Sequence, residues 1–281
     1  APFNQQQARA AESHGYLRVA PNGRYYVFDD GTSFVPVGFN LQDQFIDKYL
    51  ASNLIDTLMA QWAANGVNYL RIFPDSWLGN YLESRVGTFN PKALAFFDRV
   101  VSNAERFGIY LSVPLWDENS VLQDNSWLNY NPYNEALGLG GTATTKNDVY
   151  GATDADTFAA MKNRYKLLVN RYENSPAIMM WDFAGDWNKT SGWQQQMYDF
   201  VRAEDSKDHI ITYQRRKGGG PYDAYLDTGA VRIYDIHASN DPEAMTLALR
   251  DTDRGMLNAW SRGFPIYHGE GGMDMSITDA Y

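Results

Sequence analysis

Apolar residues follow two different periods along the chain. Short apolar runs, typical of buried strands, are separated by longer segments in which apolar residues recur every three or four positions, the spacing of an amphipathic helix. The clearest helix is expected over 91–107, where Asn90 and Pro91 supply a cap and a first helical position and Gly108 ends the segment. The chain therefore alternates between strand and helix.

Strands and helices are predicted from this pattern along most of the chain. The predicted strands cover residues 34–41, 67–73, 109–115, 177–182, 209–214, 230–236 and 264–269. The predicted helices cover residues 53–65, 91–107, 153–173, 191–205 and 242–260, with Thr153 and Asp156 as the cap of the third. Because helices separate successive strands, the strands are expected to lie parallel in one sheet, joined by right-handed crossovers.

These elements predict the α/β class, and their order predicts a (β/α)8 TIM barrel. An N-terminal β-hairpin over 16–36 is expected to cover one end of this barrel. Seven strands can be assigned before Tyr281, so the eighth strand is expected to be missing or atypical. A doubly wound sheet is the alternative, disfavoured because the chain has no glycine-rich first turn for a dinucleotide. We expect a single domain over 1–281, because no linker or internal repeat divides the chain.

Residues 116–153 have no period and are rich in Asn, Gly and Thr, with aromatic residues spaced through them. A loop of this length inside a compact domain is usually functional. We expect it to form a wall of a binding cleft, with Trp116 and Trp127 either as platforms in this cleft or as core residues.

Charge and composition limit the classes of partner and substrate that this chain is expected to bind. The chain of 281 residues has 24 Lys and Arg against 34 Asp and Glu, a net charge of −10, which disfavours nucleic acid and an anionic membrane surface as partners. It has no run of about 18 apolar residues, so no membrane insertion is expected. It has no cysteine, which excludes a thiol nucleophile and a zinc–thiolate site. A neutral or cationic substrate fits this chain better than an anionic one.

Polar residues collect after the predicted strands, where a barrel places its reactive groups. Acidic residues follow the third, fourth and seventh strands, and Trp and Tyr stand near them. Two carboxylates in an aromatic bowl are what cleavage of a glycosidic bond needs, since one protonates the leaving oxygen and the other attacks the anomeric carbon or activates water. The candidates at strand ends include Asn40, Arg71, Asp182, Asp186 and Glu270.

Five stretches resemble the strand-end signatures of clan A glycoside hydrolases of the cellulase and mannanase type: 34–41, 66–73, 181–187, 234–237 and 267–271. The resemblance covers roughly residues 16–272. It implies a (β/α)8 barrel that needs no cofactor, a retaining mechanism on a β-linked polysaccharide or oligosaccharide, and an extracellular location. It also implies an acid/base after the fourth strand and a nucleophile after the seventh.

Individual residues match this family pattern. Glu270 stands at the nucleophile position, Arg71 matches an arginine held beneath the nucleophile, and Tyr234 with His237 resembles the aromatic and histidine pair of the sixth strand. The remaining expected sugar contacts are Asn40, Trp77, Trp116, Trp127, Trp187 and His268.

The fourth strand departs from the family pattern of Trp-Glu, two residues and Asn-Glu. Gly185 replaces the Asn that binds the sugar 2-hydroxyl, and Asp186 replaces the acid/base Glu. Asp is one methylene shorter, so its carboxyl is expected about 1 Å further from the bond, a displacement that can cost about a hundredfold in rate. Asp182 matches a structural position and is the reserve candidate.

Three alternatives remain beside the glycosidase interpretation. A sugar-binding protein on an impaired glycosidase scaffold would explain Gly185 and Asp186, and a scaffold protein would make the cleft incidental. A metal site at His237 and His268 with Asp235 or Asp274 is disfavoured, since the spacing matches no metal signature. The sequence leaves open the sugar, its linkage, endo or exo action and the oligomeric state.

Overall fold

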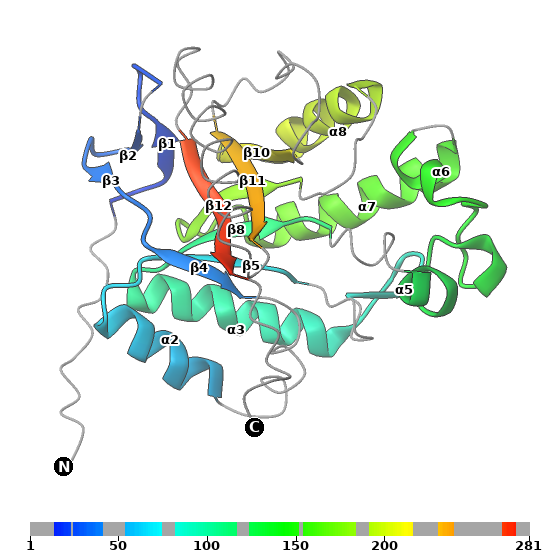
Figure 1. Cartoon of the computed structure of the whole chain (residues 1–281), viewed down its shortest axis with the longest axis horizontal. Helices are drawn as coiled ribbons and strands as arrows, with labels where there is room; N and C mark the ends of the chain where they lie inside the picture. The colour runs from blue at the N-terminus through cyan, green and yellow to red at the C-terminus, as the bar shows by residue number, and fades with distance from the viewer. Residues whose placement is uncertain are drawn as a thin grey trace.

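The computed structural model describes residues 14–23, 25–41, 54–74, 82–116, 124–151, 154–183, 191–215, 230–238 and 266–273. Within these residues a sheet of seven strands forms the centre of the molecule (Figure 1). Its strands are β4 (Gly38–Leu41), β5 (Tyr69–Ile72), β8 (Tyr110–Pro114), β9 (Ile178–Asp182), β10 (Ile210–Arg215), β11 (Ala230–Ala238) and β12 (Ile266–Met273). Each neighbouring pair is parallel.

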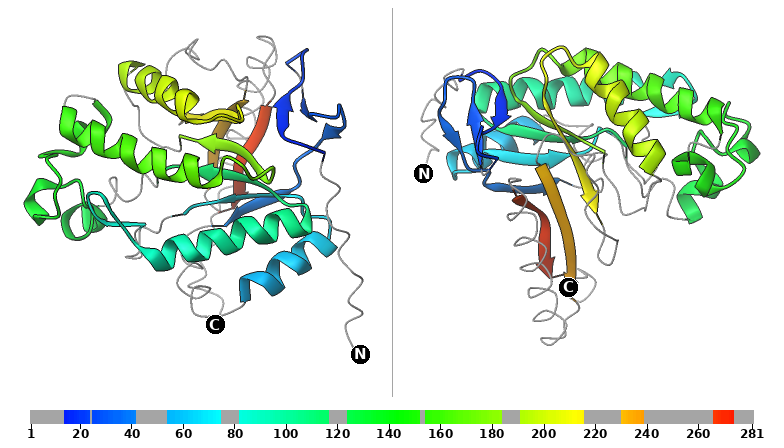
Figure 2. Two further views of the ribbon diagram at one scale, coloured as in Figure 1. Left: turned by 180° about the vertical axis from the view of Figure 1, so that it is seen from behind. Right: turned by 90° about the horizontal axis from the view of Figure 1, so that it is seen from above.

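The strands lie side by side in the order in which they occur in the sequence. This order is that of a (β/α) barrel, whereas a doubly wound sheet would reverse its order at a switch point. The sheet coils strongly, and the Cα traces of its first and last strands, β4 and β12, come within 8 Å of each other (Figure 2). The described part of the chain thus has the predicted barrel order with seven strands.

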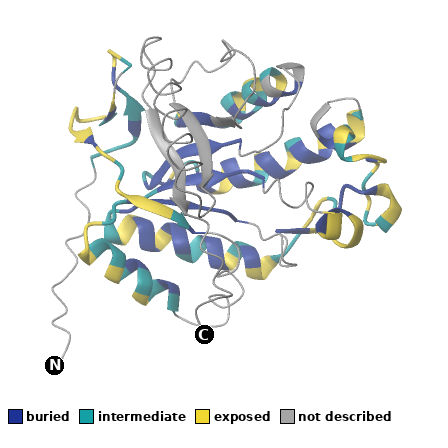
Figure 3. Cartoon of the chain, viewed as in Figure 1, coloured by how far each residue is buried: buried dark blue, intermediate teal, exposed yellow. Residues whose placement is uncertain are grey.

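Four helices cover this sheet: α2 (Leu54–Ala64), α3 (Pro91–Phe107), α7 (Ala155–Tyr172) and α8 (Ser191–Glu204). They share one large apolar cluster with β5, β8, β9 and β10. Figure 3 shows the buried side of α3 and α7 turned toward the buried strands. None of the described helices has the length and apolar character needed to cross a bilayer.

The predicted helix 91–107 is confirmed in full, because its start and its end are set locally. The Oδ1 atom of Asn90 accepts a hydrogen bond from the backbone N of Lys92 at 3.0 Å, and Gly108 ends the helix with a φ of 68°. The cap of α7 is different from the prediction. It is Asp154, whose side chain accepts a hydrogen bond from the backbone N of Asp156.

A small antiparallel sheet covers one end of the barrel, as predicted. It consists of β1 (Leu17–Val19), β2 (Tyr26–Phe28) and β3 (Ser33–Phe34). Its apolar side chains pack on Tyr69 and Ile210, the first residues of β5 and β10. It therefore covers the N-terminal ends of the parallel strands and leaves their C-terminal ends to other segments.

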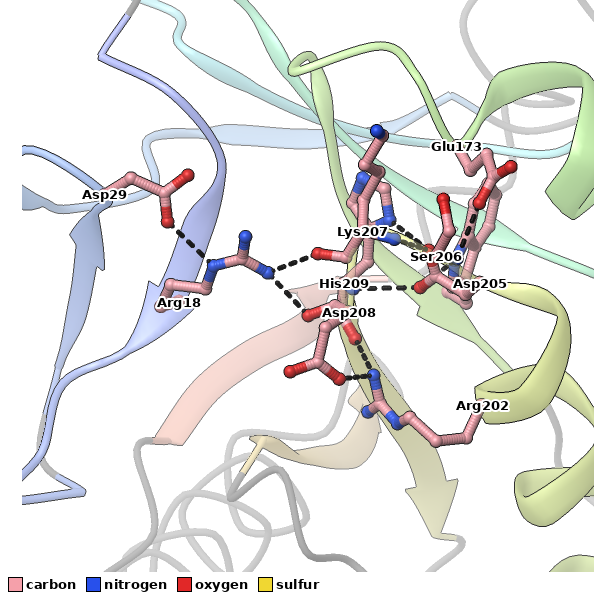
Figure 4. A network of polar contacts seen from close by, with 10 residues as sticks. Arg18, Asp29, Glu173, Arg202, Asp205, Ser206, Lys207, Asp208 and His209 are labelled. Carbon is pink, nitrogen blue, oxygen red and sulfur yellow. Dashed lines mark hydrogen bonds and ion pairs between the residues drawn. The ribbon is translucent and has the colours of Figure 1, made fainter.

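Polar contacts fasten this small sheet to the turn before β10 (Figure 4). Arg18 donates to Asp29 Oδ1 at 2.8 Å and to the backbone oxygens of Lys207 and Asp208 at 2.6 and 2.7 Å. Behind it, the buried Asp205 accepts hydrogen bonds from the Nδ1 and backbone N of His209 at 2.9 and 2.8 Å. The closed end of the barrel is thus held by charged groups as well as by apolar packing.

The prediction of one buried strand over 34–41 is wrong. Phe34 ends β3, and β4 begins at Gly38, with its first half exposed. The side chain of Asn68 binds the backbone between these two strands. Its Oδ1 accepts from the N of Val37 at 2.6 Å, and its Nδ2 donates to the O of Val35 at 3.0 Å. At Gly38 a Cβ atom would lie 1.7 Å from the carbonyl oxygen of Tyr69, so only glycine permits this approach.

Residues 116–153 are not one irregular loop. Their described part contains α5 (Asp124–Asn129), the 3-10 helix η2 (Glu135–Leu137) and α6 (Lys146–Gly151). A hairpin of β6 (Glu83–Arg85) and β7 (Thr88–Phe89), also not predicted, follows β5. These elements are too short to produce a clear period. The predicted helix 242–260 lies outside the described residues.

Candidate functional site

Candidate groups meet at the C-terminal ends of the parallel strands. Asn40 in β4 lies opposite Arg71 in β5 in the strand register, and Asp182 is the last residue of β9. Ser112 in β8 lies opposite Arg71 from the other side. The barrel order therefore brings Asn40, Arg71 and Asp182, which are far apart in sequence, to one edge of the sheet.

Arg71 and Asp182 form a buried ion pair at this edge. The Nε of Arg71 donates to Oδ2 of Asp182 at 2.7 Å, and the two side chains are 2% and 0% exposed. The guanidinium carbon also lies 4.4 Å from the ring centroid of Phe73. Moving the two strands apart would break this pair and leave a buried charge without its partner, which costs several kcal/mol. The pair therefore holds the two strands in a fixed geometry. The contact supports a structural role for Asp182.

Glu270 lies in β12, the seventh strand of the sheet, where the ladder to β11 is irregular. Ile233 pairs with His268, but the next residue, Tyr234, pairs with Glu270, so the register shifts by one residue at Gly269. His237 pairs with Gly272. Bulges of this kind are frequent beside active sites, where they redirect a side chain. The backbone thus places Glu270 opposite Tyr234 of the neighbouring strand.

Several predicted site residues lie outside what the structure describes. Trp77, Gly185, Asp186 and Trp187 fall between the described ranges. The structure describes β11 and β12 through their backbone, which includes His268 as well as Glu270. A contact between Arg71 and Glu270, and the acid/base role of Asp186, therefore stay predictions.

Trp116 and Trp127 are buried rather than presented to a cleft. They are 1% and 6% exposed and belong to the large apolar cluster. The ring of Trp116 lies 4.9 Å from that of Tyr133, centroid to centroid. This corrects the expectation that the two indoles stack on sugars, because a ring with no exposed face offers nothing to a ligand.

A buried polar cluster beside the same edge was missed by the sequence analysis. Glu83, Tyr133 and Arg164 are each at most 1% exposed, and the hydroxyl of Tyr133 donates to Oε2 of Glu83 at 2.7 Å. Burial, followed by the charge of Glu83, raises the pKa of Tyr133 well above its usual value. A signal was present in the sequence, since Arg164 falls on the apolar face of its helix with Met161 and Leu168.

Metal binding finds no support in the described part of the chain, which contains no group of three or more His, Asp or Glu side chains arranged around one point. The disfavoured metal site at His237 and His268 lies outside the residues whose side chains the structure describes.

Comparison with known proteins adds a family match. Residues 30–254 match the family model described as Cellulase (glycosyl hydrolase family 5). A mannan endo-1,4-β-mannosidase A of Podospora anserina is 29% identical over 197 residues, covering 65% of this chain and 48% of the relative. A mannan endo-1,4-β-mannosidase 4 of Oryza sativa subsp. japonica is 25% identical over 228 residues, covering 73% and 47%. The chain spans about half the length of these curated relatives.

Solved structures agree on the fold. A glycoside hydrolase family 5 mannosidase from Rhizomucor miehei superposes with a TM-score of 0.67 at 15% identity, covering 91% of this chain and 72% of that one. An endo-glycoceramidase II from Rhodococcus sp. gives a TM-score of 0.65 at 16% identity, covering 95% and 70%. Likeness at this identity supports the barrel architecture and leaves the substrate to other arguments.

Proposed function

Since the chain belongs to the cellulase family, glycosyl hydrolase family 5, we propose that it hydrolyses a β-linked neutral polysaccharide by a retaining mechanism with two carboxylates. The observation that carries the proposal is the position of Glu270 in the seventh strand, paired with Tyr234 at an irregular step of the ladder. The names of the relatives, mannan endo-1,4-β-mannosidases, support β-1,4-mannan as the substrate.

The proposed reaction has two displacements at the anomeric carbon. The carboxylate of Glu270 attacks this carbon while the carboxylic acid of Asp186 gives its proton to the glycosidic oxygen, so the C–O bond breaks and the leaving sugar departs. The Asp186 carboxylate then takes a proton from a water molecule, whose oxygen attacks the same carbon and displaces Glu270. Two inversions give retention of configuration.

The other strand-end residues have supporting roles in this proposal. Arg71, held by Asp182 at 2.7 Å, keeps a positive charge at the edge where Glu270 must stay ionised. Tyr234 and His237 support the nucleophile from the neighbouring strand, which pairs with β12 along its length. Asn40, Trp77, Trp187 and His268 are proposed sugar contacts. A polymer that does not cross membranes favours an extracellular location.

A catalytically impaired sugar-binding protein is the second candidate. It is favoured by Gly185 and Asp186, which stand where the family pattern has Asn and Glu. A shortened acid and a missing hydrogen bond to the sugar 2-hydroxyl would both act on the transition state more than on binding. This candidate predicts saturable binding of oligosaccharides without turnover.

Release of reducing ends from β-1,4-mannan, with carboxymethylcellulose as the comparison polymer, tests the proposal. The wild-type chain is expected to hydrolyse the mannan, and Glu270→Gln is expected to lose roughly a thousandfold or more in kcat. Glu204→Gln is the matched control, because Glu204 lies on α8 and pairs with Lys166 away from the strand ends. Unchanged turnover in Glu270→Gln would overturn the nucleophile assignment, and binding without turnover in the wild type would favour the second candidate.

A further inference from the structure

We propose that Arg164 is a positioning residue of the glycan cleft, which fixes the segments that follow β5 and β8 and, through them, the outer sugar subsites. The inference rests on the proposed function, since it needs a cleft that binds a chain of sugars. It concerns a group of four buried residues, Glu83, Trp116, Tyr133 and Arg164, which we call the Arg164 cluster. Nothing in the proposed chemistry uses them directly.

Arg164 makes three different contacts from one guanidinium. Its Nε donates to the backbone oxygen of Leu115 at 3.1 Å, its Nη1 lies 3.8 Å from Oε2 of Glu83, and its Cζ lies 4.7 Å from the ring centroid of Trp116. The side chain is 1% exposed. A planar group with several donors can satisfy such a set, whereas the ammonium of lysine, a point charge, cannot.

Glu83 joins two separate segments with one carboxylate. Its Oε1 accepts from the backbone N of Gly87 at 2.6 Å, inside the β6–β7 hairpin, and its Oε2 accepts from the hydroxyl of Tyr133 at 2.7 Å, between α5 and η2. Asn131 holds the same stretch, since its Oδ1 accepts from the backbone N of Tyr133 at 3.0 Å. The hairpin and the segment around Tyr133 are therefore fixed to each other.

Both segments belong to the substrate side of the barrel. The hairpin follows the C-terminal end of β5, and residues 124–151 follow the C-terminal end of β8. In a barrel, the segments that leave these ends build the cleft around the reacting groups. The N-terminal ends are covered by the small antiparallel sheet instead.

The Arg164 cluster is also connected to the candidate catalytic edge. The backbone oxygen of Leu115 accepts from Arg164, and the backbone N of Leu115 donates to the backbone oxygen of Asp182 at 2.9 Å. Asp182 in turn holds Arg71. Arg164 is thus linked to the candidate catalytic edge through the backbone of Leu115, while the Arg71–Asp182 pair itself involves no atom of Arg164.

A loosened cluster would displace the cleft segments more than the reacting groups. The hydrogen bond between Arg71 and Asp182 does not depend on a contact with Arg164, so we expect it to persist when Arg164 is replaced. The hairpin and the Tyr133 segment would lose the guanidinium, and a carboxylate would remain buried beside them. The loss of binding affinity on replacing Arg164 should therefore grow with the number of sugars that the ligand places in the cleft.

The test compares long and short ligands in a chain that does not turn them over. Dissociation constants of mannohexaose and mannobiose, with cellohexaose and cellobiose as second probes, are measured by calorimetry in the Glu270→Gln background. Adding Arg164→Lys is expected to weaken hexasaccharide binding about tenfold and disaccharide binding by less than about twofold, a loss of about 1.4 kcal/mol confined to the long ligand. Tyr133→Phe, which keeps the ring, should shift binding in the same direction.

Arg171→Lys is the matched control on the same helix. Arg171 pairs with Asp98 at 2.6 Å on the exposed side of α7, away from the cleft segments. The variant Arg171→Lys should leave the dissociation constants of both the long and the short ligand unchanged. Amide hydrogen exchange gives a second readout that needs no ligand: the amides of Gly87 and of residues 133–137 should exchange faster in Arg164→Lys, and those of α3 should not.

The outcomes separate this inference from the proposed function. Equal losses for long and short ligands, or unchanged exchange at Gly87 and 133–137, overturn the positioning role even if the wild type hydrolyses mannan. A length-dependent loss in a chain whose wild type hydrolyses nothing supports the positioning role and contradicts the proposed hydrolysis. A chain that binds neither hexasaccharide contradicts both.

Discussion

The guanidinium of Arg71 and the carboxylate of Asp182 are held 2.7 Å apart at the C-terminal ends of β5 and β9, with almost no exposure to solvent. The two residues are 111 positions apart in sequence, so the pair forms only when the barrel does. It ties together the strands that flank β8. The stability of the sheet and the geometry of the candidate site therefore depend on the same contact.

Replacing Asp182 by Asn should be strongly destabilising. The change removes the carboxylate that accepts from Nε of Arg71 at 2.7 Å, and breaking a buried ion pair in this way costs about 3–5 kcal/mol in the free energy of unfolding. Urea denaturation of wild type and Asp182→Asn measures the difference. Asp98→Asn is the control, because its ion pair with Arg171 is about two-fifths exposed and should contribute about 1 kcal/mol or less. Equal losses in the two variants would contradict the role given to the buried pair.

The N-terminal cap of α3 should make a modest contribution to the free energy of unfolding, independent of the Arg71–Asp182 pair. Asn90→Ala removes the acceptor for the backbone N of Lys92 and should lower the free energy of unfolding by about 1 kcal/mol. Asn90→Asp keeps an acceptor and should lose little. Thermal denaturation with a calorimetric enthalpy gives both values. A loss in Asn90→Asp as large as that in Asn90→Ala would argue against capping as the cause.

Asp205 should make stability depend on pH. Burial raises its pKa, but the side-chain and backbone hydrogen bonds and charge of His209, and the hydrogen bond from Trp181, outweigh burial and leave the pKa below its usual value. A depressed carboxyl pKa contributes stability that is complete above the unfolded value of about 3.9 and is lost as pH falls from there through the folded value.

The measurement for Asp205 is urea unfolding at several pH values between 7 and 3. The difference between wild type and Asp205→Asn should be constant near neutrality and should shrink once the pH falls below about 4. Asn90→Ala, which removes no charge, should differ from wild type by the same amount throughout. A difference for Asp205→Asn that does not change with pH would contradict the ionised carboxylate.

Restoring the family residues on the fourth strand should increase turnover. The double change Gly185→Asn with Asp186→Glu returns the sugar 2-hydroxyl contact and brings the acid about 1 Å closer, so we expect a gain in kcat of about a hundredfold. Each single change should give only part of it. Steady-state kinetics on β-1,4-mannan measures the gain. A double variant no faster than wild type would mean that the acid is placed by other means or is another residue.

Local signals in the sequence were enough to predict the long helix α3. Asn90, Pro91 and Gly108 set the bounds of α3 without reference to the rest of the chain. The run 34–41 was misassigned because its break depends on Asn68, which replaces the strand ladder with side-chain hydrogen bonds to Val35 and Val37. A partner thirty residues away leaves no trace in local periodicity.

The order of the strands that carry the candidate residues was predictable from the sequence, whereas the contacts of these residues were not. Arg71 lies one residue before the end of β5, whereas Glu270 lies inside β12, which runs to Met273 and not only to the predicted end at residue 269. Trp116 and Trp127 were expected in a cleft because their segment is polar, but both are buried in the large apolar cluster, where Trp116 also contacts Arg164 and Tyr133. Arg164 was hidden because a charged residue on an apolar helix face shows its role only when its partners are known.

Trapping of the covalent intermediate tests the central claim most directly. A 2-deoxy-2-fluoro mannoside with a good leaving group should form the glycosyl-enzyme and slow its breakdown, and mass spectrometry of the digested chain locates the modified residue. The account predicts one added sugar on the peptide that contains Glu270, and none when Glu270→Gln is treated in the same way. A sugar found on another carboxylate, or turnover of mannan with no trapped species and inverted configuration of the product, would contradict it.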